Sequence, residues 1–318
     1  MKVYNPNLPK NIVDELYYLN DRYFAFDEPV PLKKGLLIYP VSIKYHDDFI
    51  MASDCLTIDK TESIEGIQST NLSYLLLKMN DKNNEMEAAK FSQHFIRICE
   101  LCFQMKYGIC CKKCGKIYDY WEFLSMVSNK NKPFSCECGN NLDDNSEGFD
   151  ANIKYKLNED TKQREVLIYK DFKNPITITS EDFDRFRQIV MYQNLPDYKD
   201  DSWVDPDMRE DQREKQRLLA KKNNGATASL ERKIVCVAAK SNYTIKEIYE
   251  LTMRKFIMLL SVIDDAMNYE CTRIGLMTGM VSTKEPIEHW VYKKESDDLY
   301  GDGITVDSMQ AKISSAST

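Results

Sequence analysis

Cysteine is the residue type in this sequence whose spacing most clearly indicates chemistry. Ten cysteines occur in 318 residues, and four of them form two close pairs, each followed by glycine. Two thiolates one or two residues apart can approach the same ion, and the glycine permits the left-handed backbone step that closes the loop around it. The pairs predict a tetrahedral site of the kind zinc favours, with Cys111, Cys114, Cys136 and Cys138 as its ligands.

The spacing leaves two details of this site open. The second pair has a C-x-C pattern instead of C-x2-C, which shortens one turn and could distort the coordination. Cys110 directly precedes Cys111, so either residue can supply the first thiolate. A ribbon that has lost its metal is the alternative interpretation. Because four thiolates leave no coordination position for water, we expect structural zinc and no catalysis by the metal.

The remaining reactive groups indicate no enzyme. Cys99 and Cys102 form a further C-x2-C pair on the apolar side of a predicted helix, whereas a redox pair belongs at a helix N-terminus. We therefore expect both in the core, and Cys55, Cys236 and Cys271 as core thiols as well. The sequence contains no glycine-rich phosphate loop, nucleophile elbow or H-E-x-x-H motif, and only three histidines. It predicts no catalytic or cofactor-binding residue.

The composition of the chain excludes several classes of protein. Hydrophobic residues make up 43% of the chain and charged residues 29%, which is enough apolar material for a packed core and excludes wholesale disorder. No apolar run approaches the roughly 20 residues of a membrane-spanning helix. The first residues lack the apolar region of a secretory signal. We expect a cytoplasmic protein that contacts no membrane and has no disulfides.

Nucleic-acid binding has to be weighed against the acidic composition. The formal net charge is −7 and the pI about 5.3, whereas proteins that bind nucleic acid usually carry an electropositive surface. Six lysines and three aromatic residues nevertheless lie around the first cysteine pair: Lys106, Lys112, Lys113, Lys116, Lys130, Lys132, Tyr118, Tyr120 and Trp121. A zinc-ribbon regulator that binds nucleic acid is therefore the alternative function, although nucleic acid is not the partner we expect.

Hydrophobic periodicity predicts mainly helices around the cysteine pairs. The helices are expected at 11–23, 46–58, 71–79, 84–106, from Ser180 as N-cap to Pro196, 230–240 and 244–269, and the strands at 35–45, 151–157 and 164–172. The last helix opens with a capping box of Thr244 and Glu247. Its buried stripe should contain Ile245, Ile248, Thr252, Phe256, Leu259, Ile263 and Met267. We expect the last two helices to form an αα-hairpin and not a helix-turn-helix, because the second is too long for a recognition helix.

The predicted fold class is α+β and helix-dominated, with an inserted zinc-ribbon module and a C-terminal helical hairpin. The expected domains are an N-terminal α+β region at 1–106, the zinc-ribbon-like insertion at 107–145, a segment of hairpin, helix and charged residues at 146–222, a C-terminal helical region at 223–299 and a tail at 300–318. Trp203 stands in an acidic stretch, where it either anchors a partner or folds back onto its own domain.

Several stretches resemble a group of tail proteins from bacteriophages of Gram-positive hosts, of the tail-assembly-chaperone and baseplate-hub-assembly kind. They are 48–60 (DFIMASDCLTIDK), 179–198 (TSEDFDRFRQIVMYQNLPDY), 203–211 (WVDPDMRED), 243–256 (YTIKEIYELTMRKF) and 275–292 (GLMTGMVSTKEPIEHWVY). The resemblance covers about half of the chain, mostly its C-terminal half, and the cysteine pairs fall outside it.

The resemblance implies a morphogenesis factor without catalytic activity. Tail-assembly chaperones keep the long tape-measure protein soluble until tail-tube subunits polymerise around it, and baseplate relatives help to build the hub. The implied partners are therefore tape-measure or baseplate hub components. The implied location is the host cytoplasm during assembly, or the tail or baseplate of the virion.

Overall fold

The computed structural model describes residues 12–60, 63–128, 134–141, 148–158, 164–170, 174–198 and 228–280, together with positions 200, 211, 214–215, 282, 287 and 289–291. The chain forms two compact units. The first contains Met1–Val204 and Tyr243–Ile257, and the second contains Asp205–Asn242 and Met258–Thr318. The described chain is a helix-rich α+β protein, as the sequence predicts. No helix in the described ranges combines the length and the apolar character needed to cross a membrane.

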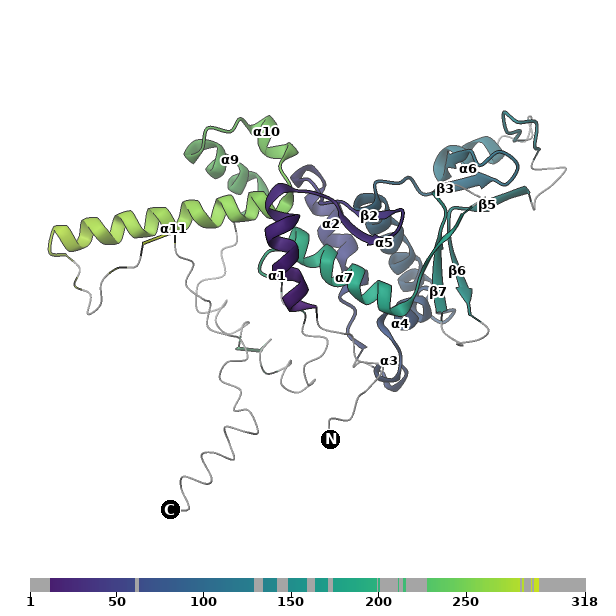
Figure 1. The fold of residues 1–318 in the computed structure, drawn as a ribbon, viewed down its shortest axis with the longest axis horizontal. Coiled ribbons are helices and arrows are strands. Elements are labelled where there is room, and N and C mark those ends of the chain that lie inside the picture. Colours follow the sequence, from purple (N-terminus) through teal and green to yellow (C-terminus); the bar gives the residue numbers. More distant parts are fainter. Residues whose placement is uncertain are drawn as a thin grey trace, which may run out of the picture. The chain divides into compact units, whose positions relative to one another are not determined.

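Three helices form the centre of the first unit: α4 (Asn71–Met79), α5 (Glu85–Phe103) and α7 (Ser180–Asn194) (Figure 1). Their apolar faces interlock, and the ring of Phe103 stacks on that of Phe186 with 4.9 Å between centroids. The N-cap of α7 is Thr179, whose side chain accepts from the backbone N–H of Asp182, and not Ser180 as predicted. The helix ends at Asn194, just before Pro196, because the residue preceding a proline disfavours helical backbone.

Short elements surround these helices. They are α1 (Val13–Arg22), η1 (Phe24–Phe26), β1 (Val30–Lys33), β2 (Leu36–Ile38), η2 (Ile43–Tyr45), α2 (His46–Ala52), η3 (Ser53–Leu56) and α3 (Ile64–Gln68). The strands β1 and β2 form an antiparallel hairpin, so the single strand predicted over 35–45 is shorter than expected. Gly35 makes this turn with a φ of +86°, a conformation in which side chains other than glycine are strained.

Two three-stranded sheets follow along the chain. The first has the order β4-β3-β5, from β3 (Gly108–Cys111), β4 (Ile117–Asp119) and β5 (Phe149–Ala151), and α6 (Tyr120–Ser128) packs on it. The second has the order β6-β7-β8, from β6 (Ile153–Leu157), β7 (Arg164–Ile168) and β8 (Ile176–Ile178). The strands β6 and β7 are the hairpin predicted at this position. The sheet β4-β3-β5 together with α6 and residues 134–141 is called the ribbon module below.

The C-terminal helices differ from the prediction in one place. Helix α9 (Leu230–Lys240) has the predicted bounds, but the following helix is broken into α10 (Ile245–Glu250) and α11 (Met253–Met277). At the break, Ile43 donates to the carbonyl of Leu251 and Met253 donates to the carbonyl of Val41, each at 2.8 Å. These bonds to a distant segment replace helical ones, so the backbone can leave the helix without losing its partners.

The predicted stripe of this helix is buried only near the break. Ile248 and Phe256 are buried, but the side chains of Ile245 and Met267 are 50% and 42% exposed. Leu259 and Ile263 are half-buried. The apolar periodicity therefore predicted helical structure on both sides of the break, but not the break itself, and it predicted the burial of the stripe only in part.

Candidate metal centre

The four cysteines of the predicted site lie together in the ribbon module. Their sulfur atoms are all within 4.8 Å of one another. The Sγ–Sγ distances are 3.6 Å for Cys111–Cys138, 3.5 Å for Cys114–Cys136 and 3.4 Å for Cys136–Cys138. Sulfur atoms bound tetrahedrally to zinc at about 2.3 Å are about 3.8 Å apart. The cluster is therefore close to the size that a four-thiolate metal site requires.

The backbone folds into the expected loop at each pair. The N–H of Gly115 donates to the carbonyl of Cys111, and the N–H of Gly139 donates to the carbonyl of Cys136, both at 2.8 Å. Gly115 and Gly139 have φ values of +80° and +77°, which is the left-handed step that the glycines were expected to supply. The four thiols are thus positioned by two similar turns, one after β3 and one in the segment 134–141.

The C-x-C spacing of the second pair does not separate its sulfurs from the cluster. Cys136 donates its N–H to the carbonyl of Asn140 at 2.8 Å, and Ser135 and Asn141 form an antiparallel bridge. This small closed loop turns both side chains to the same side. The shorter spacing is therefore accommodated by a tighter loop, without loss of the four-sulfur arrangement.

Two side chains outside the cysteine pairs donate hydrogen bonds to the sulfurs. The hydroxyl of Tyr118 donates to Cys136 Sγ at 3.1 Å, and Asn140 Nδ2 donates to Cys111 Sγ at 3.4 Å. Burial opposes ionisation of Cys111, but the bonds from Asn140 and from the backbone of Cys114 and Lys113 outweigh it and lower the pKa of this thiol to about 6. Such partners stabilise a thiolate, the form that binds metal.

The alternation of side chains along strand β3 decides which of Cys110 and Cys111 faces the other cysteines. Neighbouring residues of a strand point to opposite faces, so only one of the two can face the cluster. Cys111 does so, whereas Cys110 Sγ donates to the carbonyl of Gly115 at 3.4 Å. Burial raises the pKa of Cys110 to about 11, so this thiol stays protonated at neutral pH.

A small aromatic core supports the centre. The ring of Phe134 lies 4.8 Å from Phe123, 4.9 Å from Tyr118 and 5.4 Å from Phe149 between centroids. Cys111 and Cys136 belong to the same buried cluster. Sequence reasoning assigned Tyr118 to a nucleic-acid surface and did not identify Asn140, because neither has a spacing signal that marks it as a partner of sulfur.

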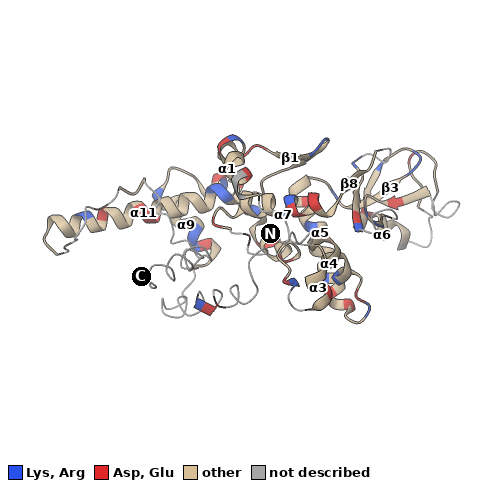
Figure 2. Ribbon diagram, turned by 60° about the horizontal axis from the view of Figure 1, so that its bottom comes forward, with Lys and Arg blue, Asp and Glu red and all other residues tan. Residues whose placement is uncertain are grey.

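The lysines of the ribbon module are largely engaged. Lys116 pairs with Glu137, and Lys112 lies 3.5 Å from Asp150. Lys113 donates to the carbonyl of Cys138 at 3.4 Å. Along the described helices and strands, basic and acidic positions are interspersed and do not separate by sign (Figure 2). Among the aromatic residues considered for contact with nucleic acid, Trp121 is 72% exposed.

Some of the predicted residues lie elsewhere. Cys99 and Cys102 are fully buried in α5, and burial raises the pKa of both, which confirms them as core thiols. Cys55 is buried too, but Cys236 is half-buried and Cys271 is exposed, so their assignment to the core was wrong. Lys130, Lys132 and Trp203 lie outside the described residues.

One family model matches the chain. Residues 220–295, about a quarter of the sequence, match the YomV second domain. YomV is encoded by a Bacillus phage. The match contains α9, α10 and α11 and leaves out the ribbon module. No curated protein and no solved structure matches the chain. In its C-terminal part, the chain is therefore similar to a domain of a phage-encoded protein.

Proposed function

We propose that the protein is a phage tail or baseplate morphogenesis factor that acts through protein–protein contacts and has no catalytic activity. The observation that carries the proposal is the match of residues 220–295 to a domain of a phage-encoded protein. The resemblance to tail-assembly and baseplate-hub proteins supplies the class of partner, which is a tape-measure or hub component. The protein acts in the host cytoplasm during assembly, or stays in the virion tail.

Helix α11 supports an interaction role. A helix of a globular protein normally buries one apolar stripe, but no described residue of α11 after Phe256 is fully buried. Its exposed apolar side chains include Val262 at 42%, Ile274 at 61% and Met277 at 77%. Exposed apolar side chains along a helix are a feature of interaction sites in soluble proteins. The part of α11 that follows Phe256, which lies in the matched domain, is therefore the surface we assign to partner binding.

The proposal is tested by co-expressing the full chain with the products of neighbouring reading frames and recording native mass spectra. We expect a stable complex with a tail protein. The double variant Ile274→Glu, Met277→Glu should lose this complex, because it places two charges on the apolar surface. The control Ser261→Glu, Asn268→Glu places two charges at exposed polar positions of α11 and should retain it. Failure of the parent chain to bind any tail or baseplate protein would contradict the proposal.

We further propose that the metal of the four-cysteine centre is zinc and that its role is structural. Four thiolates in a tetrahedral arrangement are a preferred zinc donor set, and they leave no position open for a substrate or water. The bound metal would connect the turn after β3 with the segment 134–141. The same native mass spectra, combined with metal analysis, should show one zinc per chain. A metal-free ribbon module in a folded protein would refute this part of the proposal.

A nucleic-acid-binding regulator is the second candidate, and one observation favours it. Tyr107, Tyr120 and Trp121 form a row of rings with centroid separations of 5.2 and 5.6 Å. Trp121 is exposed and the two tyrosines are half-buried, so the Trp121 ring is the one that can stack on a base. The pairing of Lys112 and Lys116 with carboxylates weakens it. Binding of single-stranded DNA or RNA at low salt, lost in Trp121→Ala, would move this candidate to first place. Absence of binding at low salt would eliminate it.

A further inference from the structure

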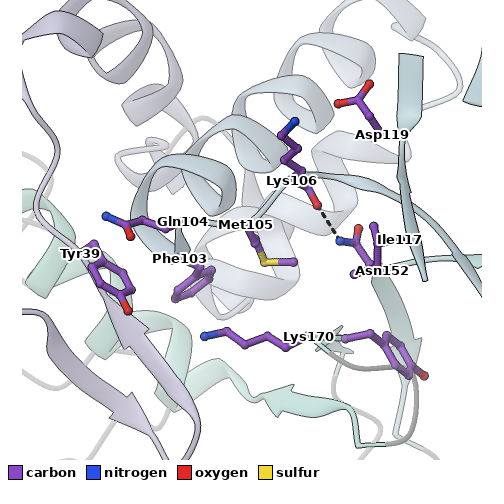
Figure 3. Close-up of a pocket in the computed structure, with 10 residues that line it drawn as sticks. Tyr39, Phe103, Gln104, Met105, Lys106, Ile117, Asp119, Asn152 and Lys170 are labelled. Atoms are coloured by element: carbon purple, nitrogen blue, oxygen red, sulfur yellow. Dashed lines mark hydrogen bonds between the residues drawn. The ribbon is translucent and has the colours of Figure 1, made fainter. Parts of the chain in front are cut away.

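A pocket of about 470 Å³ opens in the first unit, where the end of α5, strand β4 of the ribbon module and the residues after β7 meet (Figure 3). Its volume lies within the range of about 300–1,000 Å³ that is typical of small-molecule sites. None of the cysteines of the metal centre lines it. The pocket is therefore separate from the metal centre, and it also lies outside the domain that matches YomV.

The buried residue Asn152 fixes one wall of this pocket through its hydrogen bonds. Asn152 is fully buried and makes four hydrogen bonds. Its amide donates to the carbonyl of Lys106 at 2.7 Å and accepts from the N–H of Gly108 at 3.0 Å. Its backbone donates to the carbonyl of Gly108 at 3.0 Å and accepts from the N–H of Tyr169 at 2.8 Å. The three segments around the pocket are thereby fixed to one another before any ligand arrives, which lowers the cost of binding.

The opposite wall is fixed in a similar way. Tyr39 donates its N–H to the carbonyl of Cys102 at 2.7 Å, so its ring is held beside the end of α5. The helix ends there because Gln104 adopts the left-handed conformation, with a φ of +49°, which turns Met105 and Lys106 out of the helical path. The pocket thus follows from how α5 ends and is a preformed feature of the fold.

The floor of the pocket is apolar and one side is cationic. Phe103, Met105 and Ile117 supply apolar surface. In Figure 3 the side chain of Lys170 extends toward Phe103 and Tyr39, whereas Lys106 points away on the far side of Met105. Lys170 is exposed and has no acidic partner among the residues that the structure describes. An ammonium beside an apolar floor, with no described carboxylate paired to it, attracts an anion.

Asp119 is the one acidic group among the described residues of the lining, and its carboxylate is engaged in other hydrogen bonds. Asp119 accepts from the backbone N–H groups of Trp121 and Glu122 at 3.0 and 3.2 Å, and so it caps the start of α6. It is therefore held at the first turn of α6 and forms no ion pair with Lys170. On the Tyr39 side of the pocket, the lining also has the hydroxyl of Tyr39 and the amide of Gln104, both of which can donate hydrogen bonds.

We infer that this pocket binds a small organic anion. The apolar or aromatic body of the ligand packs on Phe103, Met105 and Ile117, and its carboxylate, phosphate or sulfonate group accepts from Lys170 and the hydroxyl of Tyr39. This site is independent of the proposed assembly function, because it uses neither α11 nor the metal centre. It adds a ligand-binding activity to the first unit of the chain.

The test follows the methyl signal of Met105 by NMR in the full, metal-loaded protein labelled with ¹³C-methyl methionine. Titration with naphthalene-2-carboxylate should shift this signal to saturation. The neutral analogue 2-naphthalenemethanol should bind about tenfold more weakly, because it lacks the charge-assisted bond to Lys170. The methyl groups of Met258, Met277 and Met280 report any binding to exposed apolar surface elsewhere, since these residues lie outside the pocket.

Two matched lysine variants distinguish binding of the carboxylate in the pocket from non-specific attraction of an anion to surface lysines. Lys170→Gln should weaken binding of the carboxylate about tenfold, whereas Lys106→Gln, which removes a lysine that points away from the pocket, should change it by less than about twofold. Both residues are exposed, so neither change should affect folding. An unmoved Met105 signal, an equal effect of the two variants, or shifts at the other methionines alone would overturn the inference.

Discussion

The guanidinium of Arg254 lies 4.7 Å from the centroid of the Tyr192 ring, at the start of α11. The same group lies 5.3 Å from the centroid of Phe24. It donates to the carbonyl of Tyr192 and to Asn20 Oδ1, both at 2.8 Å. Arg254 is only 5% exposed, so a buried cation is stabilised here by two aromatic faces and two hydrogen bonds. This contact fastens residues 243–257 to α7 and to the N-terminal elements of the first unit.

Replacement of Arg254 should destabilise the first unit strongly. Arg254→Ala removes both hydrogen bonds and both ring contacts, and we expect a loss of about 3 kcal/mol in the free energy of unfolding. Arg254→Lys should recover only part of it, because an ammonium cannot donate in two fixed directions and stack at once. Urea unfolding measures the difference. The exposed Arg273→Ala serves as control, and a loss below about 0.5 kcal/mol for Arg254→Ala would contradict the proposed role.

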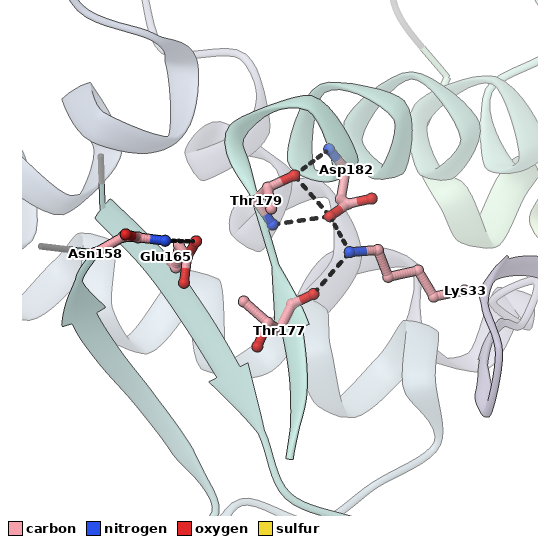
Figure 4. Close-up of polar contacts among 6 residues, drawn as sticks. All are labelled: Lys33, Asn158, Glu165, Thr177, Thr179 and Asp182. Carbon is pink, nitrogen blue, oxygen red and sulfur yellow. Dashed lines mark hydrogen bonds and ion pairs between the residues drawn. The ribbon is translucent and has the colours of Figure 1, made fainter. Parts of the chain in front are cut away.

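Lys33 and Asp182 connect the β1–β2 hairpin to the start of α7 (Figure 4). The ammonium of Lys33 contacts the carboxylate of Asp182 and donates to the carbonyl of Thr177 at 2.9 Å. Burial opposes ionisation of Asp182, but the bonds from Lys33 and Thr179 outweigh it and lower the pKa of this carboxyl below its usual value of 3.8. The ionised carboxylate is therefore favoured in the folded state.

The sign of the pH dependence follows from this shift. A carboxyl whose pKa is lower in the folded than in the unfolded state stabilises the fold above its unfolded pKa, and the contribution is lost as the pH falls through the folded value. Lys33→Met should therefore lower the free energy of unfolding at pH 7, and the difference from the parent should shrink below about pH 4. Urea unfolding at pH 7, 5 and 3.5 tests this, with the exposed Lys34→Met as control. A difference that is independent of pH would refute it.

Loss of one metal ligand should affect the ribbon module alone. Cys114→Ser removes one of the four thiols, and a module with only a small aromatic core depends on its metal for folding. We expect metal content to fall and amide exchange in 108–151 to rise, while the helical core still melts cooperatively. Cys110→Ser should retain the metal, because this thiol faces away from the cluster. Unchanged metal binding in Cys114→Ser would show that the site is assigned wrongly.

Local signals in the sequence were sufficient for part of this architecture. The bounds of α4 and α9 follow from apolar periodicity, and the cysteine pairs come together because each turn is set by residues close in the chain. The break between α10 and α11 could not be predicted, because it depends on a bridge between Thr252 and Ser42. The capping of α7 by Thr179 instead of Ser180 is a shift of one residue between two good cap formers.

The partners of the metal centre were not predictable for a similar reason. Tyr118 in β4 donates to Cys136 Sγ, and Asn140 in the segment 134–141 donates to Cys111 Sγ. The position of neither residue relative to the cysteines in the sequence indicates such a hydrogen bond. The pocket beside Asn152 is also a product of tertiary packing, since its walls come from segments more than a hundred residues apart. The sequence analysis overestimated how many residues of α11 are buried. Periodicity identifies an apolar face of a helix, but it does not show whether another element packs on that face.

Gly108 provides a last test of how the ribbon module positions its metal ligands. An added Cβ would lie 2.0 Å from the carbonyl oxygen of Tyr118 and 2.9 Å from its carbon, so strands β3 and β4 would have to separate. Because Cys111 ends β3, Gly108→Ala should weaken metal binding in competition with a chromophoric chelator and cost about 3 kcal/mol of stability in the module. Gly279→Ala, at a glycine of similar positive φ outside the ribbon module, meets nothing within 4 Å, should cost only about 1 kcal/mol and should leave metal binding unchanged. If the two variants lost metal equally, strand contact at Gly108 would not be what holds Cys111 in the cluster.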